Sequence, residues 1–134
     1  MQVNSLIAAC DVFISLHRAE GFGLVPAEAM YLGKPVIATN WSANTEFMNS
    51  EIACMVSYDF IELKQDAGPY KKSTIWADPD ISEAAEYIYK LYANPHMRTT
   101  LGTKAEAHIK EKLSLERAAT LINKRVAEIY SETS

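Results

Sequence analysis

Two glutamates, Glu20 and Glu28, lie on either side of a Gly-Phe-Gly turn at residues 21–23. An ionised carboxylate only accepts hydrogen bonds, so each glutamate suits the hydroxyl donors of a sugar or a ribose. Glycines before a helix let a ligand come close to the backbone, and the free N–H groups of the helix N-terminus attract a phosphate. A nucleotide sugar carries both kinds of group.

A purely structural interpretation of the same stretch stays open. Glu28 would then complement the positive end of the helix dipole from the first turn, and the two glycines would only make a tight turn. A Gly-x-Gly pair is a weak signal when it stands alone.

Four polar residues near the turn are further candidates for the same site, namely His17, Arg18, Asn40 and Thr45. His17 ends the preceding strand, where a structural role has more weight than a catalytic one. Arg18 is predicted to contact Glu28 or a phosphate, or else to remain solvated. Asn40 and Thr45 follow the next predicted strand, and ligands of open α/β sheets bind beyond the carboxyl ends of the strands.

The elements around the turn are typical of a strand–helix–strand unit. Residues 11–17 contain a continuous apolar run, which indicates a strand covered on both faces. A short helix is expected over 24–32, with Pro26 tolerated in its first turn and Gly33 just beyond its end. A second buried strand follows over 35–40, so the three elements should form a right-handed βαβ unit.

Further elements are expected on both sides of this unit. A helix ends near Ala9, a helical turn lies within 41–50, and a third strand covers about 53–58. Residues 62–79 are predicted to be a long irregular loop, which in a compact domain is either functional or mobile.

Three helices are expected to complete the chain. Asp80 can cap the first, with Glu83 completing a capping box, and Pro95 opens the second, which Gly102 weakens. Ser114 can cap the third helix. The apolar residues that predict inner faces are Ile81, Ala84, Ile88 and Leu91 on the first helix, and Leu115, Ala118, Ile122, Val126 and Ile129 on the third.

The predicted fold is α/β, a partial Rossmann-like domain of about three parallel strands with flanking helices and a C-terminal helical tail. Residues 1–134 would form one partial domain, with the βαβ core and long loop over 1–80 and the tail over 81–134. The edge of the sheet at the 11–17 strand is expected to lack a neighbour, which favours pairing with a second copy as a homodimer. This pattern predicts a piece of a larger protein.

Composition argues against several classes of function. The formal net charge is −4 and Lys and Arg form no long patch, so nucleic-acid binding lacks its electrostatic basis. No apolar run is long enough to span a membrane and no signal peptide is recognisable, which predicts a cytoplasmic protein. Cys10 and Cys54 are expected to be small buried thiols, and the three histidines lack the spacing of metal ligands.

The paired glutamates, with Gly21-Phe22-Gly23-Leu24 between them, resemble the motif of the retaining family-4 (group 1) glycosyltransferases. The resemblance extends to the strand before the motif, to the helix and strand after it, and to the tail helices. The insertion that contains residues 67–70 and 76–80 is similar to one in bacterial members that build surface polysaccharides. The family has the GT-B fold, in which two Rossmann-like domains face a cleft. This chain would be the second half of the C-terminal, donor-binding domain.

The resemblance also implies roles for the matching residues. Glu20 would be the catalytic residue beside the donor sugar, Glu28 would hold the ribose, and the backbone N–H groups of residues 22–24 would meet the sugar and the diphosphate. The donor would be a nucleotide-diphosphate sugar, transferred with retention. No cofactor or metal would be needed, because helix dipoles and basic side chains neutralise the leaving diphosphate.

A sugar or lipid-linked acceptor would be held by an N-terminal domain that this chain lacks, beside the inner face of the membrane in the full-length protein. We therefore expect the isolated chain to be inactive. Two alternatives stay open, a non-catalytic Rossmann-like module that binds a nucleotide or a partner, and a sugar-nucleotide epimerase. The spacing of Glu20 and Glu28 argues against the epimerase.

Overall fold

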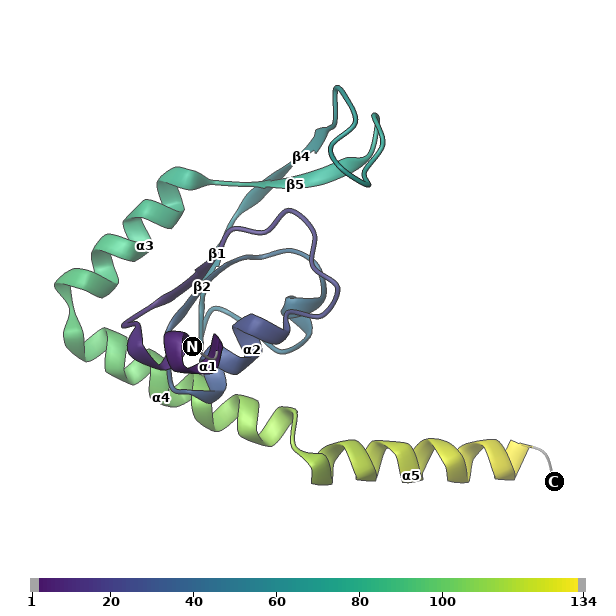
Figure 1. The fold of residues 1–134 in the computed structure, drawn as a ribbon. Helices are drawn as coiled ribbons and strands as arrows, with labels where there is room; N and C mark the ends of the chain where they lie inside the picture. Colours follow the sequence, from purple (N-terminus) through teal and green to yellow (C-terminus); the bar gives the residue numbers. More distant parts are fainter. Residues whose placement is uncertain (1–2, 133–134) are drawn as a thin grey trace.

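The computed structural model describes residues 3–132 of the chain. In chain order the elements are α1 (Val3–Ala9), β1 (Phe13–Ser15), α2 (Leu24–Tyr31), β2 (Val36–Thr39), the 3-10 helix η1 (Ala43–Glu46), β3 (Cys54–Val56), β4 (Tyr58–Glu62), β5 (Ile75–Pro79), α3 (Ile81–Ala93), α4 (Pro95–Lys112) and α5 (Leu115–Glu132). A small sheet lies between helices, a two-stranded hairpin projects from it, and α5 extends away from the body (Figure 1).

The central sheet has the order β1-β2-β3, and both pairs of strands are parallel. All four residues of β2 are buried, as expected for a strand with a neighbour on each side and a helix layer on each face. This confirms the predicted α/β fold with three parallel strands. β1 lies at one edge of the sheet, where Ile14 keeps 43% of its surface exposed.

The two faces of the sheet bury separate apolar clusters. Val36 and Ala38 point to one face, where they pack with residues of α1, α2 and α4 such as Ile7, Met30 and Ile109. The alternate residues of the sheet point to the other face. There Ile37, Cys54 and Val56 pack with Ala84 and Leu91 of α3. The βαβ unit is therefore held from both sides.

Gly102 is the point of closest approach between α4 and the turn that ends α2. A Cβ atom at this position would overlap the carbonyl oxygen of Gly33. Gly33 itself has φ +68°, the left-handed conformation expected just beyond a helix end. The prediction that Gly102 only weakens its helix is incomplete, since the missing side chain is what lets α4 reach the core.

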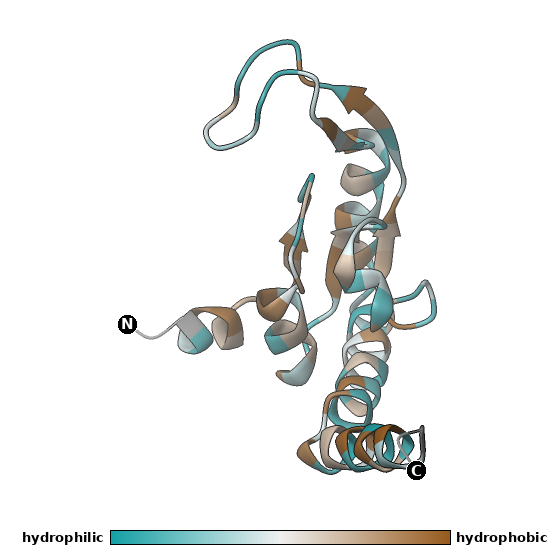
Figure 2. Cartoon of the chain, turned by 90° about the vertical axis from the view of Figure 1, so that its right-hand side faces the viewer, coloured by the Kyte–Doolittle hydropathy of each residue, from teal (hydrophilic) through white to brown (hydrophobic). Residues whose placement is uncertain are grey.

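Residues 62–79 are more ordered than predicted. β4 and β5 form an antiparallel hairpin, in which Phe60 pairs with Ala77 and Ile61 with Trp76. The expected irregular loop is therefore wrong for its last five residues, and the third strand ends at Val56 instead of continuing to Tyr58. Tyr58 and Phe60 of β4 pack on Trp41, and Trp76 of β5 packs on Tyr70 of the connecting loop. These contacts join separate segments, so one segment alone does not reveal them. Its hydrophilic tip stands apart from the hydrophobic strands of the body (Figure 2).

Helix α3 begins at the predicted cap, but only part of its predicted apolar face is buried. The Asp80 carboxylate accepts hydrogen bonds from the backbone N–H groups of Ser82 and Glu83. Glu83 does not complete a capping box, because its carboxylate accepts hydrogen bonds from the backbone and hydroxyl of Ser57 instead. Of the predicted inner face, Ala84 and Leu91 are buried, whereas Ile81 is 64% and Ile88 49% exposed.

Helix α5 carries its apolar face in solvent. Ser114 caps the helix as predicted, since its hydroxyl accepts a hydrogen bond from the backbone N–H of Arg117. The apolar residues expected to form an inner face are largely exposed, with Leu115 at 85% and Ile122 at 62%. The periodicity of this helix therefore identifies an apolar face correctly, but the described residues do not cover it.

Candidate functional site

Glu20 lies in the loop that follows β1, at the start of the glycine turn. Its Oε1 atom accepts hydrogen bonds from the backbone N–H groups of Gly21 (2.9 Å) and Phe22 (3.3 Å). No donor within residues 3–132 bonds to the other oxygen, Oε2. The turn therefore fixes one carboxylate oxygen and leaves the second available to a hydroxyl donor.

The structure explains why glycine is needed at one position of the turn but not at the other. Gly23 has φ +91°, and a Cβ there would lie 3.2 Å from both Asn44 Cβ and Phe47 Cζ. Gly21 has no positive φ, and a Cβ there would meet no atom within 4 Å. The fold thus requires glycine at position 23, whereas nothing in the described chain explains glycine at position 21.

The N-terminus of α2 opens directly from this turn and has no side-chain cap. The first N–H groups of a helix have no partner within the helix, so they need a cap, water or a ligand. Side chains of Asp80, Asn94 and Ser114 cap the N-termini of α3, α4 and α5. Helix α2 instead presents the N–H groups of Leu24 and Val25, and its positive dipole end, beside the glycine turn.

His17 holds the loop after β1 against the loop after β2. Its Nε2 atom lies 2.9 Å from the carbonyl oxygen of Trp41 and 3.0 Å from Oδ1 of Asn44. Asn44 Nδ2 donates to the carbonyl oxygen of Thr39, so Oδ1 is the acceptor. Because both partners of Nε2 are acceptors, this nitrogen carries the hydrogen. The contacts give His17 the structural role that had more weight from sequence.

Arg18 is directed away from both glutamates. Its guanidinium forms an ion pair with Asp78 of β5 at 2.6 Å and lies 5.8 Å from the centre of the Trp76 ring. The backbone of the same residue accepts a hydrogen bond from the N–H of Ala77 at 3.4 Å. Of the alternatives predicted for Arg18, the contact with Glu28 is therefore absent among the described residues, and the side chain stays 44% exposed in its ion pair with Asp78.

Asn40 and Thr45 lie beyond the carboxyl end of β2, as predicted, and both side chains are exposed. Thr45 Oγ1 donates to the carbonyl oxygen of Ser42 at 2.7 Å. Ser42 Oγ in turn donates to the carbonyl oxygen of Glu20 at 2.5 Å. Within this loop, Ser42 and the fully buried Asn44 are the residues that bond to the loop after β1. Neither was named individually among the predicted site residues. Their only sequence signal is polarity after a buried strand.

Phe22 and Leu24 contribute their side chains elsewhere. The Phe22 ring packs on Phe47 with 5.5 Å between ring centres. Both Phe22 and Leu24 line an apolar pocket of about 400 Å³ with residues of the α4–α5 junction such as Leu113 and Leu121. Only their backbone groups remain for the role predicted from the family.

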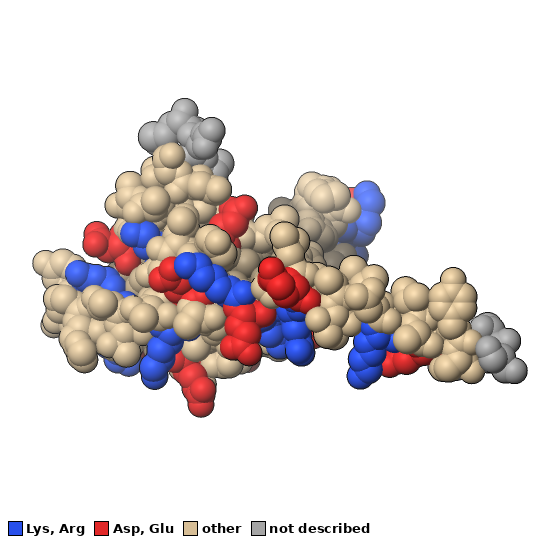
Figure 3. All heavy atoms as spheres, turned by 90° about the horizontal axis from the view of Figure 1, so that it is seen from below, with Lys and Arg blue, Asp and Glu red and all other residues tan. Residues whose placement is uncertain are grey.

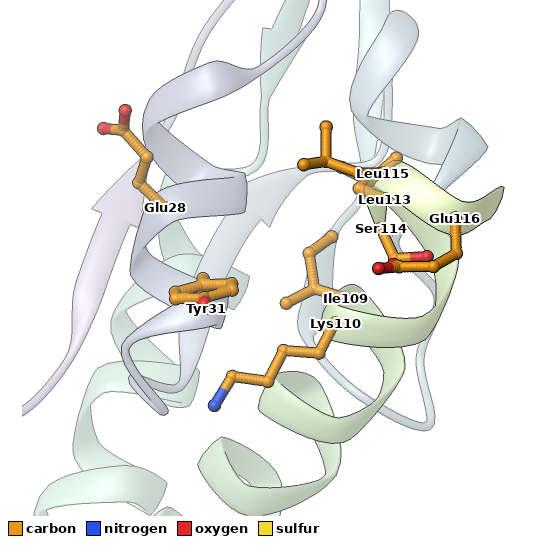
Figure 4. Close-up of a pocket in the computed structure, with 8 residues that line it drawn as sticks. All are labelled: Glu28, Tyr31, Ile109, Lys110, Leu113, Ser114, Leu115 and Glu116. Atoms are coloured by element: carbon orange, nitrogen blue, oxygen red, sulfur yellow. The ribbon is translucent and has the colours of Figure 1, made fainter. Parts of the chain in front are cut away.

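Glu28 lies on the second turn of α2 and is exposed. It belongs to the rim of a pocket of about 540 Å³ that is otherwise lined by Tyr31 and by residues of the α4–α5 junction, namely Ile109, Lys110, Leu113, Ser114, Leu115 and Glu116. Figure 4 shows its carboxylate pointing away from these residues. The first-turn dipole interpretation is wrong, since no acidic residue lies in the first turn of α2. No hydrogen bond or ion pair from the described residues reaches the Glu28 carboxylate.

Acidic and basic residues are mixed on one face of the molecule (Figure 3). Acidic and basic side chains alternate over the face seen from below (Figure 3). Lys110 illustrates this mixing, since it pairs with Glu106 and lies 4.9 Å from the centre of the Tyr31 ring. Within residues 3–132, no three His, Cys, Asp or Glu side chains gather as a metal site would require. Over the same residues, every helix is too short or too polar to cross a membrane.

The two thiols differ in environment. Cys54 is buried in β3, as predicted, and burial raises the pKa of its thiol to about 11, opposed by the charge of Lys90. Cys10 is only partly buried, which corrects the prediction, and its Sγ lies 3.0 Å from the carbonyl oxygen of Ile7. Neither residue adjoins Glu20.

Comparison with known proteins identifies the family. The sequence profile described as "Glycosyl transferases group 1" matches residues 1–108, which include the sheet, the glycine turn and most of α4. The chain belongs to this family. In these terms the Glu20–Glu28 motif lies on an α/β domain of a group 1 glycosyltransferase, and α5 lies beyond the matched region.

Relatives of this group 1 glycosyltransferase chain include two mannosyltransferases and a trehalose synthase, each from a different organism. It is 29% identical over 115 residues to the alpha-1,3/1,6-mannosyltransferase ALG2 of Homo sapiens, covering 86% of this chain and 23% of ALG2. It is 39% identical over 62 residues to the lipopolysaccharide core biosynthesis mannosyltransferase LpsB of Rhizobium meliloti, covering 44% of this chain and 18% of LpsB. A trehalose synthase of Pyrococcus horikoshii is 25% identical over 127 residues, covering 91% of this chain and 25% of that enzyme. The chain thus spans about a quarter or less of each relative.

Proposed function

We propose that this chain binds the nucleotide-diphosphate sugar donor of a retaining glycosyltransferase. The observation that carries the proposal is the glycine turn, where a carboxylate with one unbonded oxygen adjoins a helix N-terminus without a side-chain cap. The carboxylate suits a sugar hydroxyl, and the helix N-terminus suits a phosphate. Both face the side of the sheet where the parallel strands end, the usual place for such a ligand.

In this proposal Glu20 is the catalytic residue beside the sugar and Glu28 binds the ribose. The N–H groups of Phe22, Gly23 and Leu24 lie close to the diphosphate. The Phe22 N–H bonds only weakly to Glu20, at 3.3 Å, so a phosphate oxygen can replace that contact. The dipole of α2 supplies positive potential, so no metal ion or cofactor is assigned to this part of the protein.

The sugar is proposed from the relatives. ALG2 and LpsB are both mannosyltransferases by name, which favours mannose as the transferred unit. LpsB acts in lipopolysaccharide core biosynthesis, and this supports a role in bacterial surface polysaccharide synthesis, at the cytoplasmic face of the membrane. The acceptor would be a sugar or a lipid-linked sugar bound by an N-terminal domain.

Titration of the 134-residue chain with GDP-mannose and with UDP-glucose, followed by calorimetry, tests the donor site. We expect saturable binding of at least one probe, weakened about tenfold or more in Glu28→Gln, because a ribose hydroxyl loses a charged acceptor. Glu111→Gln is the matched control, since Glu111 is an exposed helical glutamate of α4. Equal affinity in both variants would contradict the assignment of Glu28.

The same chain is expected to bind a donor without turning it over. Catalysis depends on groups placed on both sides of the reacting centre, and the N-terminal domain would supply the acceptor side. Hydrolysis or transfer of either probe by the purified chain would contradict this. Absence of binding together with a stable homodimer, formed through the open edge of β1, would favour a non-catalytic module instead.

A further inference from the structure

Ser42 has a backbone conformation that serines rarely adopt. Its φ is +77° and its ψ is −162°, a region that is essentially restricted to glycine. Such a conformation persists only where the surrounding contacts fix it, and it is found most often at functional sites. The question is therefore what the hydroxyl does that glycine could not do.

The hydroxyl of Ser42 holds the peptide of Glu20. Its Oγ donates to the carbonyl oxygen of Glu20 at 2.5 Å and accepts from the backbone N–H of the same residue at 3.4 Å. These two residues are 22 positions apart in sequence, so the contact joins the loop after β1 to the loop after β2. No other side chain among the described residues bonds to the Glu20 backbone.

The backbone of Ser42 is fixed from its other side. Its carbonyl oxygen accepts hydrogen bonds from the N–H of Thr45 at 3.2 Å and from Thr45 Oγ1 at 2.7 Å. The carbonyl of the preceding residue, Trp41, lies 2.9 Å from His17 Nε2. The backbone of Ser42 is therefore held between η1 and the end of β1, and this places its hydroxyl beside the Glu20 peptide.

We propose that Ser42 is a positioning residue that keeps the Glu20 carboxylate in the orientation needed for the donor sugar. This inference rests on the proposed function, because it gives the purpose of the orientation. With the Glu20 peptide held by Ser42, the side chain folds back onto the N–H groups of Gly21 and Phe22 and directs Oε2 outward. The strained backbone is retained because only a residue with a hydroxyl makes this pair of hydrogen bonds to the Glu20 peptide.

The variant Ser42→Gly removes the backbone strain at position 42 and also the hydrogen bonds of the hydroxyl to Glu20. Glycine adopts the observed φ and ψ without steric strain, which offsets the lost hydrogen bonds and the greater entropy of the unfolded chain, so the variant should fold with a Tm close to that of the wild type. Ser73→Gly is the matched control, because Ser73 is the other described non-glycine residue with positive φ, at +69°, and lies in the loop that joins β4 and β5. It relieves strain without touching Glu20.

The first measurement is amide hydrogen exchange by NMR, which needs no donor. In Ser42→Gly we expect the amides of Gly21 and Phe22 to exchange at least severalfold faster than in the wild type, because their acceptor is no longer held. In Ser73→Gly both rates should remain unchanged. Wild-type rates in Ser42→Gly would overturn the proposal.

The second measurement is calorimetric titration with GDP-mannose and UDP-glucose. We expect Ser42→Gly to bind the preferred probe about tenfold more weakly than the wild type, although its Tm stays close to the wild-type value. Unchanged affinity would overturn the proposal even if donor binding itself is established. If the wild type binds neither probe, the proposed function fails, and hydrogen exchange alone then decides whether Ser42 holds Glu20.

Discussion

At the scale of single residues, the turn contains two glycines that answer to different requirements. Gly23 is needed by the fold, because its backbone is left-handed and its Cα hydrogens face Asn44 and Phe47. Gly21 has an ordinary backbone and open space around it. A glycine with no internal reason, next to an available carboxylate, is what close approach of a ligand would require.

Substitution of each glycine by alanine separates these requirements. Gly23→Ala should lower the free energy of unfolding by about 1–2 kcal/mol, the cost of a left-handed L-residue. Gly21→Ala should leave the free energy of unfolding nearly unchanged and weaken binding of the donor probe. Urea unfolding and calorimetry measure the two quantities. A stable Gly21→Ala variant with wild-type affinity would show that ligands do not approach the turn at this position.

At this scale a site residue can be predicted from sequence when its contacts lie within a short stretch of the chain. The motif identified Glu20 and the glycine turn, because their chemistry is visible in a short stretch. Ser42 and Asn44 were missed, since their roles come from contacts with residues more than twenty positions away. The ion pair of Arg18 with Asp78 was not among the predicted alternatives for the same reason, because the hairpin brings the two residues together.

At the scale of elements, local signals located the strands of the sheet and the caps of the helices. The βαβ unit, the Asp80 cap and the Ser114 cap all depend on neighbouring residues and were predicted correctly. The hairpin and the burial of the helix faces depend on pairing across the chain, so sequence periodicity alone misplaced them. Gly102 is the clearest example, because the absence of a side chain there allows the close contact between α4 and Gly33.

Gly102→Ala should be strongly destabilising although alanine favours helices. The added methyl group would overlap the Gly33 carbonyl, and separating α4 from the end of α2 should cost about 1–3 kcal/mol. Thermal unfolding measures the loss. Thr103→Ala, at an exposed position of the same helix, is the control and should change stability little. A more stable Gly102→Ala variant would contradict the packing described for this contact.

Glu83 links α3 to the end of β3 in a way that depends on pH. The hydroxyl and the backbone N–H of Ser57 hold the pKa of the Glu83 carboxyl below its ordinary value. Because the folded pKa is lower than the unfolded one, the contribution is complete above the unfolded pKa. It is lost as pH falls through the folded pKa.

Glu83→Gln should therefore lower the free energy of unfolding at pH 7 by about 0.5–1 kcal/mol, a value reduced by solvent screening. The difference between variant and wild type should shrink as the pH falls below about 4. Thermal unfolding across this pH range measures it. Glu86→Gln on the same helix removes only an exposed ion pair with Lys90 and serves as the control. A difference that is constant with pH would contradict the linkage.

At the scale of the whole molecule, stability is concentrated in the sheet and the helices packed on it. Ile109 of α4 is 3% exposed and belongs to the larger apolar cluster, whereas Ile122 of α5 is 62% exposed. The molecule is therefore a packed body with one helix whose apolar face remains in solvent, as its extended position in Figure 1 shows.

The same substitution at these two isoleucines should give very different results. Ile109→Ala should cost about 2–5 kcal/mol of stability, because it leaves a cavity in the core. Ile122→Ala should change stability by about 0.5 kcal/mol or less, as at other exposed positions. Chemical unfolding measures both. A large loss in Ile122→Ala would show that α5 packs on another surface in solution, for instance in a second copy of the chain.

The attachment of the hairpin has a practical consequence for labelling. Its base is tied to the Glu20 loop through the Arg18–Asp78 ion pair and the Ala77 N–H, while its tip is hydrophilic and remote from the sheet. We therefore expect the tip to accept an inserted tag or fluorophore without moving the glycine turn. A fluorophore at the tip would be connected to the proposed donor site only through β4, β5 and the contacts of Arg18 with β5.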